Sequence, residues 1–241
     1  ASTTAAAPRA EVSYAKAQKA LSKGKTSKAI DYAEKAVRAE PRNAQYRALL
    51  GKVYLEAGRY QSAAMSFGDA LALGDQDPRT VLRYALTPTA IGGGKNALDK
   101  LMKFERAMDP ADVGLAMALA GNPERCVFVL TYALRSGQNN AKVRQNLAYT
   151  YALAGNWRAA RVMAAEDVPV DQLDARLSNW AANARPEDHM VRVSQLLGIS
   201  PVRDGGVPTT LALSNFPSPA QMAAAKKAQA PQEKAPAQVA M

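Results

Sequence analysis

The chain has 241 residues, of which 48% are apolar and 6% aromatic, and its Lys and Arg outnumber Asp and Glu to give a formal charge of +10. Cys126 is the single cysteine, which excludes an internal disulfide, and no apolar run approaches the roughly 18 residues that a membrane span requires. The charge permits nucleic acid, an anionic membrane surface or an acidic protein as partner, without choosing among them.

The first nine residues, ASTTAAAPR, are small and polar, and they lack an initiator methionine. We expect residues 1–9 to form a flexible N-terminal segment that follows a removed export signal. Apolar residues at helical spacing start after it and continue for most of the chain.

Glycines recur at a fixed interval along residues 10–174. Gly24, Gly58 and Gly92 are 34 residues apart, Gly121 and Gly155 are again 34 apart, and one shorter step of 29 separates Gly92 from Gly121. A period of 34 resembles that of the tetratricopeptide repeat (TPR), a pair of helices joined by a short turn. The resemblance implies an all-α, right-handed superhelical solenoid of about five units with a concave inner groove.

The small and aromatic residues follow the same frame. Glycine or alanine at helix crossings lets two backbones approach, while larger side chains one turn away fill the space beside them. The copy around Gly58 resembles the TPR signature at nearly every position: Leu50, Gly51, Tyr54, Gly58, Arg59, Tyr60, Ala63, Phe67 and Ala70.

The array is expected to be irregular at residues 78–110. Pro88 falls in the last turn of a first helix, where the missing N–H predicts an early helix end, and Gly92 to Gly94 predict a loose turn. The unit that follows has lost part of its first helix, which predicts a local irregularity and a hinge. The GGGK run is not a phosphate-binding loop, because Asn96 follows the lysine and no strand precedes it.

Composition changes after the repeats. Residues 175–198 predict capping helices, which a solenoid needs because its terminal units have a different outer face. Residues 199–241 carry Pro and Gly breaks and then an Ala, Lys, Gln and Pro tail, which predicts an extended and mostly disordered segment. Within it, TTLALSNF has strand-like character, so it could lie along this chain or add to the sheet of a partner.

Catalysis has little support in the residues. Cys126 occupies a small core position of the repeat, and the single histidine, His189, is expected to face solvent or to cap a helix. We therefore predict a protein without enzymatic activity, cofactor or bound metal.

The predicted function is binding by the concave groove. In TPR arrays the first helix of each pair lines this groove, and carrying that frame over predicts a mixed aromatic, amide and cationic surface suited to an extended peptide or helix. The predicted groove residues are Tyr14, Gln18, Gln45, Lys52, Leu55, Lys142, Gln145 and Tyr149.

Residues Val143 to Ala182 carry a more specific resemblance. The segment RQNLA, a glycine turn and a proline before the next helix resemble the last repeat of the TadD-type proteins that assemble tight-adherence (Flp) pili. That resemblance implies a periplasmic, outer-membrane-associated scaffold, with the pilus secretin or other secretion components as protein partners. Lipid anchoring through an N-terminal cysteine, usual in that family, has no matching residue here.

Three alternatives stay open at this stage. The tail resembles linkers that tether repeat domains to a cell-wall-binding module, which predicts an envelope tether. The charge of +10 is compatible with a solenoid that binds nucleic acid, although the basic residues are spread along the helices without a binding motif. A homo-oligomer is the third, with the tail or terminal helix of one chain in the groove of another.

Overall fold

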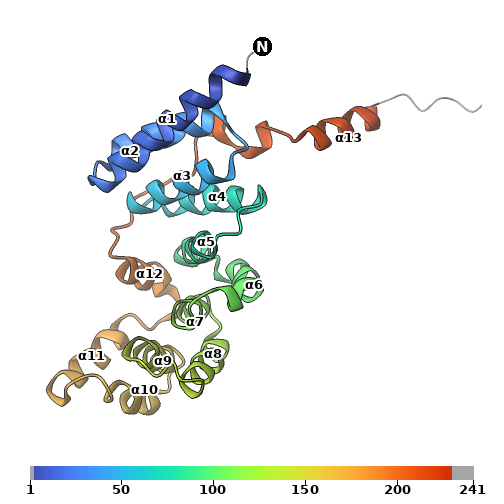
Figure 1. Cartoon of the computed structure of the whole chain (residues 1–241). Coiled ribbons are helices and arrows are strands. Elements are labelled where there is room, and N and C mark those ends of the chain that lie inside the picture. Colours follow the sequence, from blue (N-terminus) through green and yellow to red (C-terminus); the bar gives the residue numbers. More distant parts are fainter. Residues whose placement is uncertain (1–2, 230–241) are drawn as a thin grey trace, which may run out of the picture.

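The computed structural model describes residues 3–229, and within that range the chain is all-helical. Five helix pairs stack in chain order into a solenoid, as Figure 1 shows. The pairs are α1 (Thr3–Ser22) with α2 (Thr26–Ala39), α3 (Ala44–Glu56) with α4 (Tyr60–Ala72), α5 (Pro78–Ala90) with α6 (Gly94–Phe104), α7 (Pro110–Leu119) with α8 (Pro123–Arg135), and α9 (Ala141–Leu153) with α10 (Trp157–Ala164). The predicted TPR-type solenoid is confirmed, and α1 already includes most of the N-terminal segment that was expected to be flexible.

The recurring glycines form the turn within each pair. Gly58, for example, has φ +75°, and the N–H of Arg59 donates to the carbonyl of Tyr54 at 2.9 Å. The same bond closes the turn of the third pair, where the N–H of Gly93 donates to the carbonyl of Pro88. A positive φ is open to glycine at little cost, which explains the glycine period in the sequence.

The core of each pair depends on a close helix crossing. A methyl group placed on Gly51 of α3 would lie 2.7 Å from the ring of Phe67 on α4, and one on Gly114 of α7 would lie 3.0 Å from Leu130 on α8. Phe67 and Leu130 are fully buried. The backbones therefore approach because the first helix carries no side chain at the contact.

Pro88 does not end α5 where the sequence predicted. The helix continues for two residues, to Ala90, although proline supplies no N–H for the carbonyl of Tyr84. The hydroxyl of Thr87 donates to that carbonyl at 2.9 Å instead. The first helix of the next pair, α7, is shortened to ten residues, as expected. None of the described helices combines the length and apolarity needed to cross a membrane.

The two helices after the repeats behave differently from each other. α11 (Val170–Ala182) covers α9 and α10 and so caps the stack. α12 (His189–Leu197), preceded by a 3₁₀ turn at Pro186–Asp188, returns to the middle of the array and packs on α5 and α7. The hydroxyls of Tyr60 and Ser194 hydrogen-bond at 2.9 Å and tie it also to α4.

Residues 199–216, called the strap below, are ordered along the N-terminal repeats. In Figure 1 the chain leaves α12, reaches the α3–α4 turn and reappears beside α2 before α13 (Pro219–Gln229), which projects from the array. The expected strand-like TTLALSNF lies along this chain as two 3₁₀ turns, Thr209–Leu211 and Leu213–Asn215. This differs from the expectation of a mostly disordered tail. The amino-acid composition of a segment does not show which distant repeats it will contact, so it could not predict this order. The predicted tail from residue 230 on lies outside the described residues.

Replacement of Gly58 by alanine should destabilise the chain more than the same change at Gly24. Both residues have positive φ, so each substitution costs about 1 kcal/mol for the left-handed backbone. At Gly58 the new methyl would also overlap the carbonyl oxygen of Ser200, whereas Gly24 has open space. We expect Gly58→Ala to lower the free energy of unfolding by about 1 to 3 kcal/mol more than Gly24→Ala does, as measured by denaturant unfolding. Equal losses at the two sites would mean that the strap does not pack on this turn.

Candidate binding groove

A hollow of about 760 Å³ lies between α1, α3, α5 and the α4–α5 loop. Tyr14 stands at one wall, where its ring lies 5.1 Å from that of Tyr46 and its hydroxyl accepts a hydrogen bond from the Gln18 amide at 3.1 Å. Leu49 and the small side chains of Ala44 and Ala48 form apolar parts of the lining. The hollow thus combines an aromatic wall with a partly apolar floor.

Charged groups of both signs surround this hollow. Lys52 on α3 and Arg83 on α5 are half-buried, and Glu56 is exposed. Asp77 caps α5 through the N–H of Arg79 and also accepts from the Arg79 guanidinium, which holds the pKa of the Asp77 carboxyl below its usual value. Amide, carboxylate and cationic groups together can hold the main chain and polar side chains of an extended peptide.

The structure brings four of the eight predicted groove residues together. Tyr14, Gln18, Gln45 and Lys52 all line the hollow. Leu55, from the same prediction, is 4% exposed and belongs to the core. Leu55 is one turn after Lys52 but points to the buried side of α3. The repeat frame alone does not distinguish residues that line the groove from residues that belong to the core.

The other three predicted residues lie in a different part of the array. Tyr149 and Gln145 line a hollow of about 260 Å³ between α7, α9, α11 and α12, and the Tyr149 ring is covered by that of Trp180 at 5.5 Å. Lys142 forms ion pairs with Asp112 at 2.7 Å and Asp109 at 3.7 Å. Because α12 packs on α5 and α7, the two sets do not share one hollow.

Two lining residues, Arg79 and Arg83, were missed by the sequence reasoning although a signal was present. They stand one repeat period after Gln45 and Leu49, both of which line the same hollow. The third unit departs from the repeat pattern, so the correspondence of Arg79 with Gln45 and of Arg83 with Leu49 was not recognised. Extending the frame through residues 78–90 would have found both arginines.

The groups considered for catalysis are held by separate elements. Cys126 is buried against Thr150, whose hydroxyl lies 3.0 Å from the sulfur, and burial raises the pKa of its thiol to about 11. The half-buried His189 ring lies 3.3 Å from the Pro186 carbonyl oxygen. The described residues contain no cluster of three or more His, Cys, Asp or Glu side chains placed to hold a metal ion.

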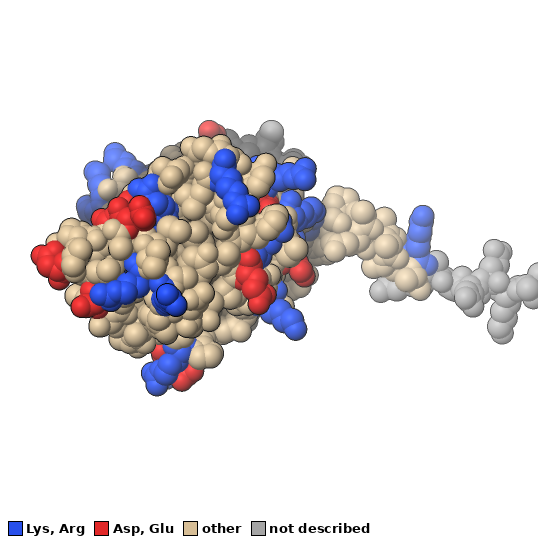
Figure 2. Space-filling view, turned by 90° about the horizontal axis from the view of Figure 1, so that it is seen from below, with Lys and Arg blue, Asp and Glu red and all other residues tan. Residues whose placement is uncertain are grey.

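Basic and acidic side chains are interspersed at the end of the stack. Figure 2 looks along the array from the side of α10 and α11, and it shows Lys and Arg beside Asp and Glu rather than a field of one sign. Several are paired, as Arg161 is with Asp174. On this face the charge of +10 is thus not gathered into a stripe of the kind that tracks phosphates.

Comparison with known proteins supports the fold. Residues 14–78 match the tetratricopeptide repeat family, and 17 chains of known structure match the fold, which is that of a TPR solenoid. No curated protein sequence matches this chain.

Three solved structures illustrate the likeness in fold. YrrB, described as a TPR protein with an unusual peptide-binding site, has 20% identity and a TM-score of 0.54 over 68% of this chain and 88% of its own. MamA (41-end) from Desulfovibrio magneticus RS-1 has 20% identity and a TM-score of 0.57, over 70% and 96%. A second MamA structure has 16% identity and a TM-score of 0.53, over 81% and 98%.

Proposed function

We propose that this protein is a non-enzymatic interaction scaffold that binds an extended segment of a partner protein in the hollow between α1, α3 and α5. The observation that carries the proposal is the lining of that hollow, in which Tyr14, Gln18, Gln45 and Lys52 converge from two first helices. Main-chain groups of a peptide need such amide and cationic partners, and an aromatic wall supplies apolar contact. The peptide-binding site of YrrB, a protein of the same fold, supports this assignment.

We further propose a bacterial envelope as the setting, with the protein in the periplasm near the outer membrane. The resemblance of Val143 to Ala182 to pilus assembly proteins supports this setting, and it suggests a secretin or another pilus or secretion component as the partner. The binding experiment below tests both the hollow as the binding surface and the class of partner.

Charge reversal at Lys52 is expected to weaken partner capture about tenfold, which equals about 1.4 kcal/mol of binding free energy. Lys52 lines the hollow, so Lys52→Glu places a carboxylate where the partner would meet an ammonium group. The matched control is Lys100→Glu on α6, which is exposed and lies outside the hollow. Both variants should keep the circular dichroism spectrum of the wild type.

The measurement is affinity capture from detergent-solubilised bacterial envelope on the tagged chain, with mass spectrometry of the bound proteins. A secretin or pilus component retained by the wild type and the Lys100→Glu variant, but lost with Lys52→Glu, would support both parts of the proposal. Equal retention by all three chains would reject the hollow as the binding surface. Retention of nucleic acid alone, with a steep salt dependence, would replace the scaffold with a nucleic-acid binder.

A further inference from the structure

The strap lies across α2 and α4, on the other side of α3 from the hollow. It contacts Arg47 of α3 and the N-terminal turn of α4, and its first 3₁₀ turn packs on α2. Along α3, Arg47 is about half a turn away from Gln45, which lines the hollow. The strap and a peptide in the hollow would therefore occupy separate surfaces.

Asp204 of the strap supplies a cap that the α4 sequence lacks. The residue before α4 is Arg59, which makes no side-chain capping bond, whereas six other helices of the array are capped by the Asn or Asp before them: Asn43, Asp77, Asp109, Asn122, Asn140 and Asn156. The Asp204 carboxylate accepts from the N–H of Ser62 at 2.6 Å, in the first turn of α4, and from its hydroxyl at 2.7 Å. The cap is thus delivered from a distant segment.

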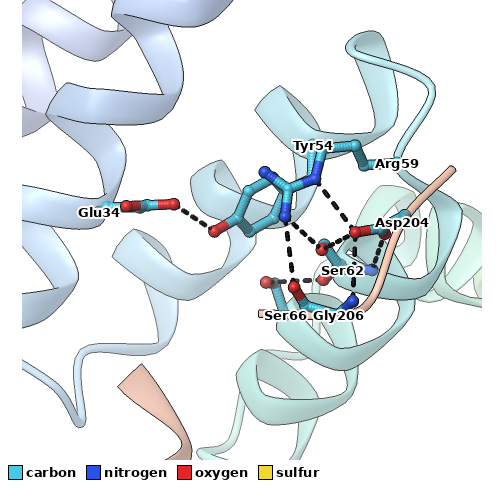
Figure 3. Close-up of polar contacts among 7 residues, drawn as sticks. All are labelled: Glu34, Tyr54, Arg59, Ser62, Ser66, Asp204 and Gly206. Carbon is cyan, nitrogen blue, oxygen red and sulfur yellow. Dashed lines mark hydrogen bonds and ion pairs between the residues drawn. The ribbon is translucent and has the colours of Figure 1, made fainter. Parts of the chain in front are cut away.

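The Asp204 side chain is only 4% exposed, and its charge is matched at short range. Burial raises the pKa of this carboxyl, but the bonds from Ser62 and from the N–H of Gly206, with the Arg59 guanidinium at 3.1 Å, outweigh it and leave the pKa below its usual value. Figure 3 shows Arg59 and Ser62 of the repeats and Gly206 of the strap converging on Asp204. The site is therefore selective for an ionised carboxylate.

Two of the donors, the Arg59 guanidinium and Ser62, also have partners within the repeats, and Arg59 donates in addition to the Gly206 carbonyl of the strap at 3.2 Å. The Arg59 guanidinium lies 4.5 Å from the centre of the Tyr54 ring, and the Tyr54 hydroxyl donates to Glu34 of α2 at 2.6 Å (Figure 3). Arg59 also donates to the Ser62 hydroxyl at 3.1 Å. The Tyr54 ring and the Ser62 hydroxyl thus orient Arg59 from within the repeats, and such preorganisation is a property of a binding site.

The remaining strap contacts are apolar anchors and main-chain hydrogen bonds. Leu211 is 0% exposed and is its deepest apolar anchor. Main-chain groups add hydrogen bonds: Arg47 donates to the carbonyl of Leu211 at 2.7 Å, and Arg42 donates to that of Phe216 at 2.7 Å. One carboxylate, one leucine and several carbonyls are what a groove recognises in a linear segment.

We propose that the surface of α2, α3 and α4 beneath the strap is a second peptide-binding site, which the strap occupies as a ligand from the same chain. Its partner is a linear segment of another protein that carries an aspartate and, seven residues later, a leucine, as Asp204 and Leu211 do here. Such a segment binds by displacing the strap. A tethered ligand competes at an effective concentration of about a millimolar, so the site is masked until the strap is weakened or the partner is abundant.

The test uses the full chain and a fluorescent synthetic peptide of residues 200–216, with binding followed by anisotropy. Asp204→Ala weakens the strap of the protein, and this variant should bind the peptide at least tenfold more tightly than the wild type. A probe peptide with the same substitution should bind at least tenfold more weakly than the original. Adding Arg59→Ala to the Asp204→Ala chain should abolish the gain, and Asp171→Ala, an exposed carboxylate on α11, should leave binding at the wild-type level.

Hydrogen exchange of the wild-type chain provides a second measurement in case Asp204→Ala unfolds. With saturating, isotope-labelled peptide, the amides of the protein's own strap should exchange faster while those of α4 keep their protection. Unchanged strap exchange at saturation would overturn the proposal, as would peptide binding by a folded Asp204→Ala chain that is no tighter than wild type. Neither result bears on the hollow between α1, α3 and α5.

Discussion

Replacing Arg47 with alanine is expected to lower the free energy of unfolding by about 3 to 5 kcal/mol, the usual loss when one partner of a buried ion pair is removed. Arg47 is 0% exposed and joins three segments. It donates to the Pro41 carbonyl at 2.9 Å, to the Asp69 carboxylate at 2.8 Å and to the Leu211 carbonyl at 2.7 Å. Alanine would leave all three acceptors without this donor.

The pair itself is not a source of large net stability. Burial lowers the pKa of the Arg47 guanidinium and raises that of the Asp69 carboxyl, which means that desolvation outweighs their attraction at both groups. Arg47→Met with Asp69→Leu, which removes both charges, should therefore lose less stability than Arg47→Ala alone. Arg47→Lys should fall between wild type and Arg47→Ala, since one ammonium cannot reproduce the guanidinium fork.

Guanidinium unfolding followed by circular dichroism and by hydrogen exchange would measure these differences, because a solenoid can unfold repeat by repeat. Arg79→Ala is the matched control: Arg79 also pairs with an aspartate, but its side chain is 79% exposed, and we expect no measurable change. A loss with Arg47→Ala no larger than with Arg79→Ala would contradict the role of Arg47 as a tie between repeats and strap.

The second large effect concerns the contact between Gly51 and Phe67. Phe67→Ala should cost about 3 to 5 kcal/mol, since a ring that is 1% exposed would be replaced by a cavity. Gly51→Leu should cost about 1 to 3 kcal/mol or more, because even its first carbon would lie 2.7 Å from that ring. Both losses follow from the close crossing of α3 and α4.

The double variant, Gly51→Leu with Phe67→Ala, should lose less than the sum of the two single losses, because the leucine can enter the space left by the ring. Thermal and denaturant unfolding of the four chains measures this coupling. The control is Gly68→Ala on α4, where the new carbon would lie 3.4 Å from Tyr84, an ordinary contact, and where alanine should be neutral or stabilising. Additive losses in the double variant would mean that Gly51 and Phe67 do not share one packing site.

The lining of the candidate binding groove was only partly predictable. Tyr14, Gln18, Gln45 and Lys52 were found because the repeat frame places one face of each first helix on the inner side of the stack. Tyr149 was assigned to the same groove by that frame, yet Trp180 covers it. The return of α12 onto α5 and α7 is a long-range packing event, and repeat periodicity contains no information about it.

The sequence by itself determined the local architecture of this protein: helix pairs, turns at glycines of positive φ, and close crossings at small residues, all of which depend on neighbours within one repeat. Only the tertiary structure decided where the chain goes after α12. Arg59, the residue before α4, makes no side-chain capping bond, so the sequence shows that this helix lacks a cap of its own. The residue that caps it, Asp204, binds Ser62 from 142 positions away in the sequence. This contact forms only when the repeats are stacked and their donors lie beside the strap, so no local sequence pattern specifies it.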